Sequence, residues 1–103
     1  GVSTSTDEAV PSRRLSVSAA PNPFNPITEI SFASPTAGVV TVAIHDVAGR
    51  LVRTLLSADL PAGDHTVRWN GRDDDGRTLP SGTYHAVVRA PAGLTSTRLT
   101  LIK

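Results

Sequence analysis

Residues 69–84 read Trp-Asn-Gly-Arg-Asp-Asp-Asp-Gly-Arg-Thr-Leu-Pro-Ser-Gly-Thr-Tyr. A β-type run ends on the large aromatic Trp69, and a second run begins just after Ser81-Gly82 and carries Tyr84. The segment between them is polar and interrupted by glycines. Such segments turn because glycine adopts positive φ and aspartate hydrogen-bonds to its own backbone. Two strands joined in this way indicate an all-β domain.

Further β-type runs extend in both directions from this segment, separated by turn signals at a spacing of about 8–12 residues. Asp46–Arg50 suits a tight hairpin with Gly49 in the left-handed position, and two Pro-Ala-Gly segments supply further turns. No segment keeps a helical period over a useful length. The sequence therefore predicts seven strands, at 14–20, 27–33, 38–46, 50–56, 64–70, 82–90 and 94–102.

Side chains in these runs alternate between apolar and polar residues, which is typical of antiparallel strands with one buried face. The fold predicted from this pattern is a seven-stranded antiparallel, immunoglobulin-like (fibronectin III-like) β-sandwich. Phe24 lies between two Asn-Pro pairs that stiffen the chain, and we expect it to plug the end of the core. The residues expected to face the core are Val40, Val42, Ile44, Val67, Trp69, Tyr84, Ala86, Val88, Leu99 and Leu101.

The length of 103 residues fits one domain. Residues 1–13 are small and polar and are expected to form a flexible linker or N-terminal arm, and residues 14–103 the sandwich. The chain has no Met, so we expect a processed product or an excised domain, and without Cys it can form neither disulfides nor zinc–thiolate sites. The net charge of +1 does not favour nucleic-acid binding. No apolar run is long enough for a transmembrane segment.

The acidic run of residues 73–75 raises the possibility of a calcium loop. With Gly76 at position 6 of a helix-flanked calcium loop, positions 1 and 12 fall on Gly71 and Gly82, which cannot supply side-chain ligands. We expect a solvated turn with no metal or other cofactor. A looser site that uses Asn70, Asp73 and Asp75 stays open as a weaker alternative.

No catalytic residues are predicted, because the chain lacks a Gly-x-Ser-x-Gly elbow and is too small for a cleft between domains. His45, His65 and His85 lie at intervals of twenty residues, which reflects successive strands; we expect exposed strand residues and no close His pair. Trp69 could stack on a sugar, but its parity with Val67 favours packing in the core.

Several motifs occur together in a recognisable order. Pro21-Asn22-Pro23-Phe24-Asn25-Pro26 leads into a strand, Asp46-x-x-Gly49-Arg50-x-Val52 follows another, Gly63-x-His65-x-Val67-x-Trp69-Asn70-Gly71 precedes the polar loop, and Pro80-Ser81-Gly82-Thr83-Tyr84 closes it. Over residues 19–103 the chain resembles the immunoglobulin-like domain named after the flagellar hook-capping protein. It is also similar to the C-terminal sorting domains of the type IX secretion system.

This resemblance implies a non-catalytic C-terminal module of a secreted or cell-surface bacterial protein that acts in export sorting and surface attachment. The expected partners are the secretion or attachment machinery and the upstream domain of the parent protein. The residues expected to contact the machinery are those of the last strand, Leu99, Leu101, Ile102 and Lys103. A structural or adhesive spacer and a carbohydrate-binding module remain as alternatives.

Overall fold

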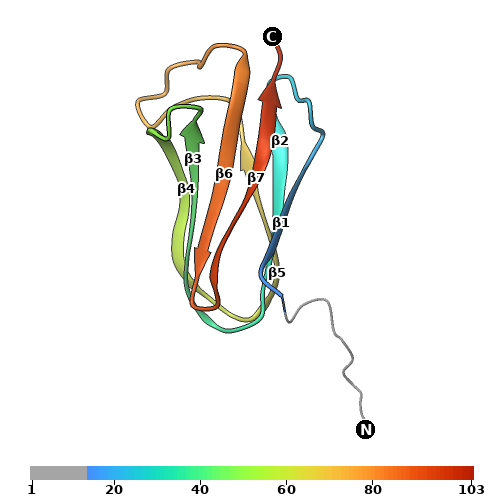
Figure 1. Cartoon of the computed structure of the whole chain (residues 1–103), viewed down its shortest axis with the longest axis vertical. Coiled ribbons are helices and arrows are strands. Elements are labelled where there is room, and N and C mark those ends of the chain that lie inside the picture. The colour runs from blue at the N-terminus through green and yellow to red at the C-terminus, as the bar shows by residue number, and fades with distance from the viewer. Residues whose placement is uncertain (1–13) are drawn as a thin grey trace, which may run out of the picture.

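The computed structural model describes residues 14–103, which form two antiparallel sheets packed face to face (Figure 1). The expected arm at residues 1–13 lies outside the described residues. The seven strands are β1 (Ser16–Ala20), β2 (Thr28–Ser34), β3 (Gly38–Asp46), β4 (Leu51–Leu60), β5 (Gly63–Trp69), β6 (Gly82–Ala90) and β7 (Gly93–Leu101).

One sheet has the strand order β1-β2-β5 and the other the order β4-β3-β6-β7. Every pair of neighbouring strands is antiparallel. This arrangement confirms the predicted immunoglobulin-like sandwich. No helix within residues 14–103 is long and apolar enough to cross a membrane.

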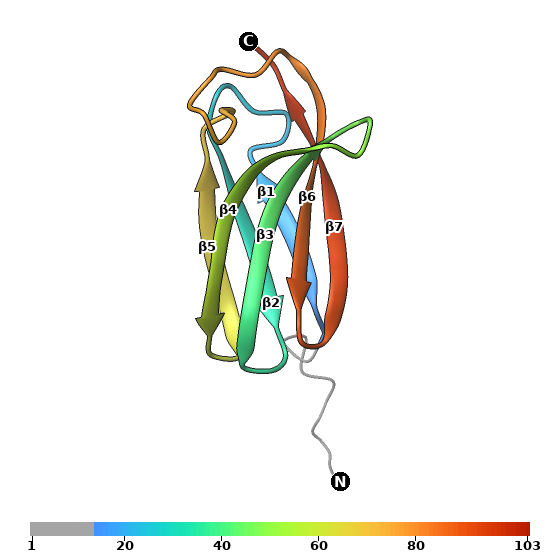
Figure 2. The same ribbon diagram turned by 90° about the vertical axis from the view of Figure 1, so that its left-hand side faces the viewer.

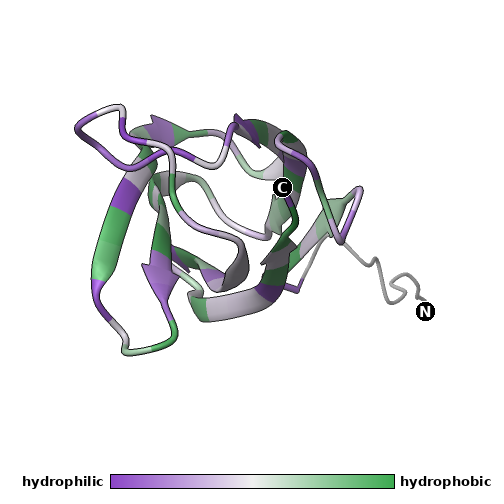
Figure 3. Ribbon diagram, turned by 90° about the horizontal axis from the view of Figure 1, so that it is seen from above, coloured by the Kyte–Doolittle hydropathy of each residue, from purple (hydrophilic) through white to green (hydrophobic). Residues whose placement is uncertain are grey.

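The strand faces follow the predicted alternation. Seen from the end that carries the C-terminus, hydrophobic and hydrophilic residues alternate along the strands (Figure 3). Val40, Val42 and Ile44 of β3 are fully buried, and they face the inner side chains of the other sheet. The core also includes Phe24, Ile30, Phe32, Trp69, Tyr84, Ala86, Val88, Leu99 and Leu101.

The fourth strand is longer than expected, because β4 continues to Leu60. Its pairing with β3 is irregular in two places: Val42 pairs with Leu56 and Ala43 with Thr54, so Leu55 has no partner, and Val52 is skipped in the same way. Such bulges insert one residue and shift the phase of the alternation. Both bulges lie within the predicted segment, whereas residues 57–60 beyond it alternate regularly between exposed and half-buried, so the end of this strand was simply placed too early.

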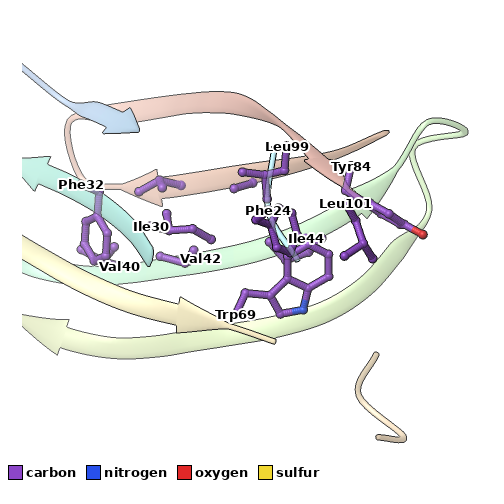
Figure 4. Packing of buried hydrophobic residues seen from close by; sticks show 12 residues of the cluster. Phe24, Ile30, Phe32, Val40, Val42, Ile44, Trp69, Tyr84, Leu99 and Leu101 are labelled. Carbon is purple, nitrogen blue, oxygen red and sulfur yellow. The ribbon is translucent and has the colours of Figure 1, made fainter. Parts of the chain in front are cut away.

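Three aromatic side chains meet at the end of the core near the C-terminus (Figure 4). The Trp69 ring lies 5.4 Å from the Phe24 ring and 5.5 Å from the Tyr84 ring, measured between centroids. Trp69 comes from one sheet, Tyr84 from the other, and Phe24 from the connection between β1 and β2. This cluster ties both sheets to the connection that closes them.

Replacing Trp69 by Ala removes the centre of this cluster, because the side chain is only 1% exposed. We expect a loss of about 3–5 kcal/mol in the free energy of unfolding, typical of a large aromatic truncated in a core. Denaturant unfolding measures it, with Thr66→Ala on the exposed face of the same strand as the control. A Trp69→Ala variant as stable as that control would contradict the assigned packing.

Candidate functional site

The end of the sandwich that carries the C-terminus, here called the loop end, gathers the three longest connections between strands (Figure 1). It consists of the β1–β2 connection, the β3–β4 hairpin, the β5–β6 loop and the residues after β7. The β3–β4 hairpin projects to one side of it (Figure 2). The acidic residues and the C-terminal residues singled out in the sequence all lie here.

The acidic loop contains a turn in which Asp73 bonds to its own backbone. Its Oδ1 atom accepts hydrogen bonds from the backbone N–H groups of Asp75 and Arg77, at 3.0 and 2.9 Å. Its carbonyl accepts from the N–H of Gly76, which has a φ of 82°. This is the local bonding that makes aspartate and glycine favourable in turns.

The β3–β4 hairpin is a second copy of the same turn. Asp46 Oδ1 accepts from the N–H groups of Ala48 and Arg50 at 3.0 and 2.9 Å, and its carbonyl accepts from the N–H of Gly49. The shared motif is Asp-x-x-Gly-Arg, in residues 46–50 and 73–77. The sequence signal for the role of the acidic loop was therefore present as an internal repeat, but the run of three aspartates obscured it.

Charge at the β3–β4 hairpin is balanced locally. The backbone N–H of Arg50 lowers the pKa of Asp46 below its ordinary value of 3.8, and the Arg50 guanidinium lowers it further. The Arg50 Nη2 atom lies 3.1 Å from Asp46 Oδ2.

Burial is the main cause that raises the pKa of the Tyr84 hydroxyl above its ordinary value, and the nearby Asp46 carboxylate raises it further.

The next aspartate of the acidic loop docks against an edge strand. Asp74 Oδ1 accepts from the N–H of Thr54, and the Asp74 N–H donates to the carbonyl of Val52. Arg53 adds a hydrogen bond from Nη1 to the Asp73 carbonyl at 3.1 Å. Because β4 is the edge of its sheet, these contacts cover backbone groups that would otherwise be open to another chain. Sequence reasoning missed this role, because it depends on a contact across twenty residues.

The three residues of the weaker calcium alternative have different surroundings. Asn70 Oδ1 accepts from the Arg72 N–H, Asp73 is committed to its turn, and Asp75 is exposed. The acidic residues line a cleft of about 420 Å³ that Arg50 and Arg77 also line. Within residues 14–103 no three acidic or histidine side chains group closely enough to hold a metal ion.

Calcium should leave the melting temperature of the protein unchanged up to millimolar concentrations, because Asp73 Oδ1 already accepts two backbone hydrogen bonds and no third acidic side chain of residues 14–103 completes a ligand set. Differential scanning calorimetry across a calcium series measures this. A rise in melting temperature with calcium, lost in an Asp73→Asn and Asp75→Asn double variant, would show that the loop binds the ion in the folded state.

The last strand is held on its outer side by the β1–β2 connection. The Asn22 Nδ2 atom donates to the Arg98 carbonyl, and Asn22 Oδ1 accepts from the Thr100 N–H, at 2.8 and 3.0 Å. The Phe24 N–H donates to the Thr100 carbonyl, and the Phe24 carbonyl accepts from the Ile102 N–H, both at 2.9 Å. The connection therefore acts as a short strand beside the end of β7.

Gly71 allows this region to close. It is buried with a φ of 74°, and a Cβ atom there would lie 3.4 Å from both the Leu101 Cδ2 atom and the Pro26 carbonyl oxygen. A side chain would be strained and crowded at this position. The loop after Trp69 can therefore pack directly against β7 and the β1–β2 connection.

The four residues expected to contact a secretion machine divide into two pairs. Leu99 and Leu101 are 0% and 1% exposed and belong to the core. Ile102 is 47% exposed, and Lys103 is also exposed, with its backbone N–H bonded to Ser81 Oγ at 3.0 Å. Only the second pair presents side chains to a partner without unfolding the sandwich.

Two of the three histidines are neighbours in the structure, which corrects the expectation that the chain has no close pair of histidines. His45 of β3 and His85 of β6 are direct partners in the sheet register. His65 lies in the other sheet, where its ring is 5.5 Å from that of Phe32 and its Nε2 atom lies 2.8 Å from the Pro61 carbonyl. The even spacing in sequence hid the pair, because β3 and β6 are adjacent in the sheet but not in the chain.

The fold and the connections at the loop end define an immunoglobulin-like domain of antiparallel strands with a closed core. The FlgD Ig-like domain family matches residues 24–93. This match covers more than half of the chain, and the chain belongs to that family.

Among curated proteins, the chain is similar to the basal-body rod modification protein FlgD of Salmonella typhimurium, with 46% identity over 57 residues. The Escherichia coli protein of the same name is 41% identical over 57 residues. Each match covers 55% of this chain but only 25% of the relative. The chain thus corresponds to about a quarter of the length of these relatives.

Solved structures include PorZ of Porphyromonas gingivalis, described as a surface component of the type IX secretion system. It is 29% identical with a TM-score of 0.55, over 84% of this chain and 11% of that one. FlgD of Xanthomonas campestris is 27% identical with a TM-score of 0.53, over 73% and 55%. PorU of P. gingivalis, at 22% identity and a TM-score of 0.65 over 84% and 9%, shares the fold.

Proposed function

We propose that residues 14–103 form a non-catalytic module that marks an exported bacterial protein for sorting and surface attachment. The observation that carries the proposal is the exposed end of the last strand. Ile102 and Lys103 project from the loop end while Leu99 and Leu101 fix the strand in the core. A translocation machine can contact these two exposed side chains without opening the fold.

The similarity to PorZ supports this proposal in two ways. PorZ, at 29% identity, is named as a surface component of a type IX secretion system. The shared region is a small part of that protein, which fits a module appended to a larger chain. We propose a location outside the cell or on its surface, with the secretion or attachment machinery as the partner.

A second candidate function is structural: a spacer or assembly module of a hook-cap-like protein. The 46% identity to the Salmonella FlgD protein favours it. This role also needs no catalytic residue, and it differs from sorting in requiring no signal in the last residues. The two candidates are therefore separated by what happens when only the exposed end is changed.

Carbohydrate binding loses the feature that suggested it. Trp69 is 1% exposed, and its Nε1 atom donates to the Arg72 carbonyl at 2.9 Å. The other aromatic side chains, those of Phe24, Phe32 and Tyr84, are 2%, 2% and 5% exposed. A sugar platform needs an aromatic face in solvent, and none of these residues offers one.

Export of a reporter tests the sorting proposal. A secreted reporter joined to residues 14–103 and expressed in a host with a type IX system should reach the surface. Deleting Ile102 and Lys103, or adding a soluble tail after Lys103, should reduce export severalfold. The melting temperature should hardly change on adding the tail, because exposed terminal residues contribute little to stability.

Leu94→Ser is the matched control, because Leu94 is an exposed apolar residue (60%) at the other end of the same strand. It should leave export unchanged. A reporter that is exported equally well with the intact module, with the altered end and without the module would rule out sorting and favour the structural role.

A further inference from the structure

The close pair of histidines lies on the outer face of the four-stranded sheet. His45 and His85 are opposite each other in the antiparallel pairing of β3 and β6. Their chain neighbours Ile44, Tyr84 and Ala86 are buried in the core. Because successive side chains of a strand point to opposite faces, both imidazoles point outward on the same face.

The pairing brings the two rings within reach of one ion. Directly opposed residues in an antiparallel pair have Cβ atoms about 4.5–5.5 Å apart. A histidine nitrogen binds zinc at about 2.0–2.1 Å. Two imidazoles that extend from such a pair can therefore meet at a single metal ion above the sheet.

The imidazole of His45 is already held in a tautomer that can bind a metal ion through Nε2. The Nδ1 atom of His45 lies 3.2 Å from the carbonyl oxygen of Gly49. A carbonyl oxygen only accepts, so Nδ1 carries the proton and Nε2 keeps a free lone pair. Metal-binding histidines are oriented by this kind of bond to their other nitrogen. The ring of His85 has no hydrogen bond within the described part of the chain, so both of its nitrogens remain available.

The surroundings leave room for an ion with water. His45 and His85 line one shallow groove of about 370 Å³, together with the side chains of Ser96 and Leu94 from β7. Nitrogen ligands suit the late divalent metals of the first transition row, whereas calcium and magnesium prefer oxygen. The chain has no Cys to compete for such a metal.

Charges around the pair limit the affinity. Arg98 of β7 is opposite His85, and Arg89 of β6 lines the same groove as the two histidines. On the β4 side, His45 is paired with the apolar Leu51. Asp46 follows His45 in the chain but is bound to Arg50. The nearest fixed charges to the pair are thus mainly positive, which weakens cation binding without removing the ligands.

We propose that His45 and His85 form a two-histidine site for a late first-row divalent metal ion, with zinc, nickel or copper held by Nε2 of His45 and one ring nitrogen of His85, and water completing the coordination. This site is independent of the sorting proposal. It lies on a sheet face, whereas the proposed sorting residues lie at the end of β7.

Zinc titration of the untagged protein, followed by NMR of the histidine side chains, tests the site. The ring signals of His45 and His85 should shift together as zinc is added, and those of His65 should not. Isothermal titration should give at least about tenfold weaker binding for His85→Ala. His65→Ala is the matched control, because that ring lies in the other sheet and is bonded to Pro61.

Two further measurements test whether zinc affinity changes in the expected direction with nearby charge and with pH. Arg98→Ser removes a positive charge opposite His85 and should tighten zinc binding, by up to about tenfold at low salt. Binding should weaken as the pH is lowered, because protons compete with the metal ion for the ring nitrogens. Unchanged affinity in His85→Ala, weaker zinc binding in Arg98→Ser, or equal shifts at His65 would each overturn the proposal.

Discussion

The packing of Trp69 between Phe24 and Tyr84 is the interaction on which the rest of the structure depends. Trp69 comes from one sheet, Tyr84 from the other and Phe24 from the connection between β1 and β2. The ring centroids of Phe24 and Tyr84 lie 5.4 and 5.5 Å from that of Trp69. Two of these three side chains also hold loops by their polar atoms. Trp69 Nε1 donates to the Arg72 carbonyl, and the Tyr84 hydroxyl donates to the Pro80 carbonyl at 2.7 Å. The long β5–β6 loop is therefore attached at both ends to the core.

Both edges of the four-stranded sheet are covered at the loop end as a consequence. The β5–β6 loop, once anchored, places Asp74 against the backbone of Val52 and Thr54 on β4. The β1–β2 connection, fixed by Phe24, pairs with Thr100 and Ile102 at the end of β7. Exposed strand edges invite pairing with other chains. The polar loops of this domain thus protect both edges of the sheet near the loop end.

Sequence reasoning recovered the parts of the structure that depend on local periodicity. The alternation around Val42, Trp69 and Leu99 gave the strands, their buried faces and the sandwich. It failed where pairing across the sheet decides the outcome. The bulges at Val52 and Leu55 interrupt the alternation of β4, and they depend on its pairing with β3. The edge contact of Asp74 and the pairing of His45 with His85 depend on which strands are neighbours, and a single sequence does not state this.

The family membership and the geometry agree on an immunoglobulin-like domain with a closed core, and neither by itself assigns its role. The matched region is a quarter of the length of the FlgD relatives and a smaller part of PorZ. A domain of this kind serves larger proteins of different function, so the fold alone does not assign one. In the sorting proposal, the residues that would distinguish these roles are the exposed Ile102 and Lys103.

The most direct test of this account is native-state hydrogen exchange of the backbone amides of Thr100 and Ile102. Both donate outward from β7, to Asn22 and Phe24. If the β1–β2 connection closes the core with Phe24, these amides open only when the domain unfolds, with the same free energy as the core amides of β6. Exchange as fast as in an unprotected edge strand, while the β6 amides stay protected, would contradict the account.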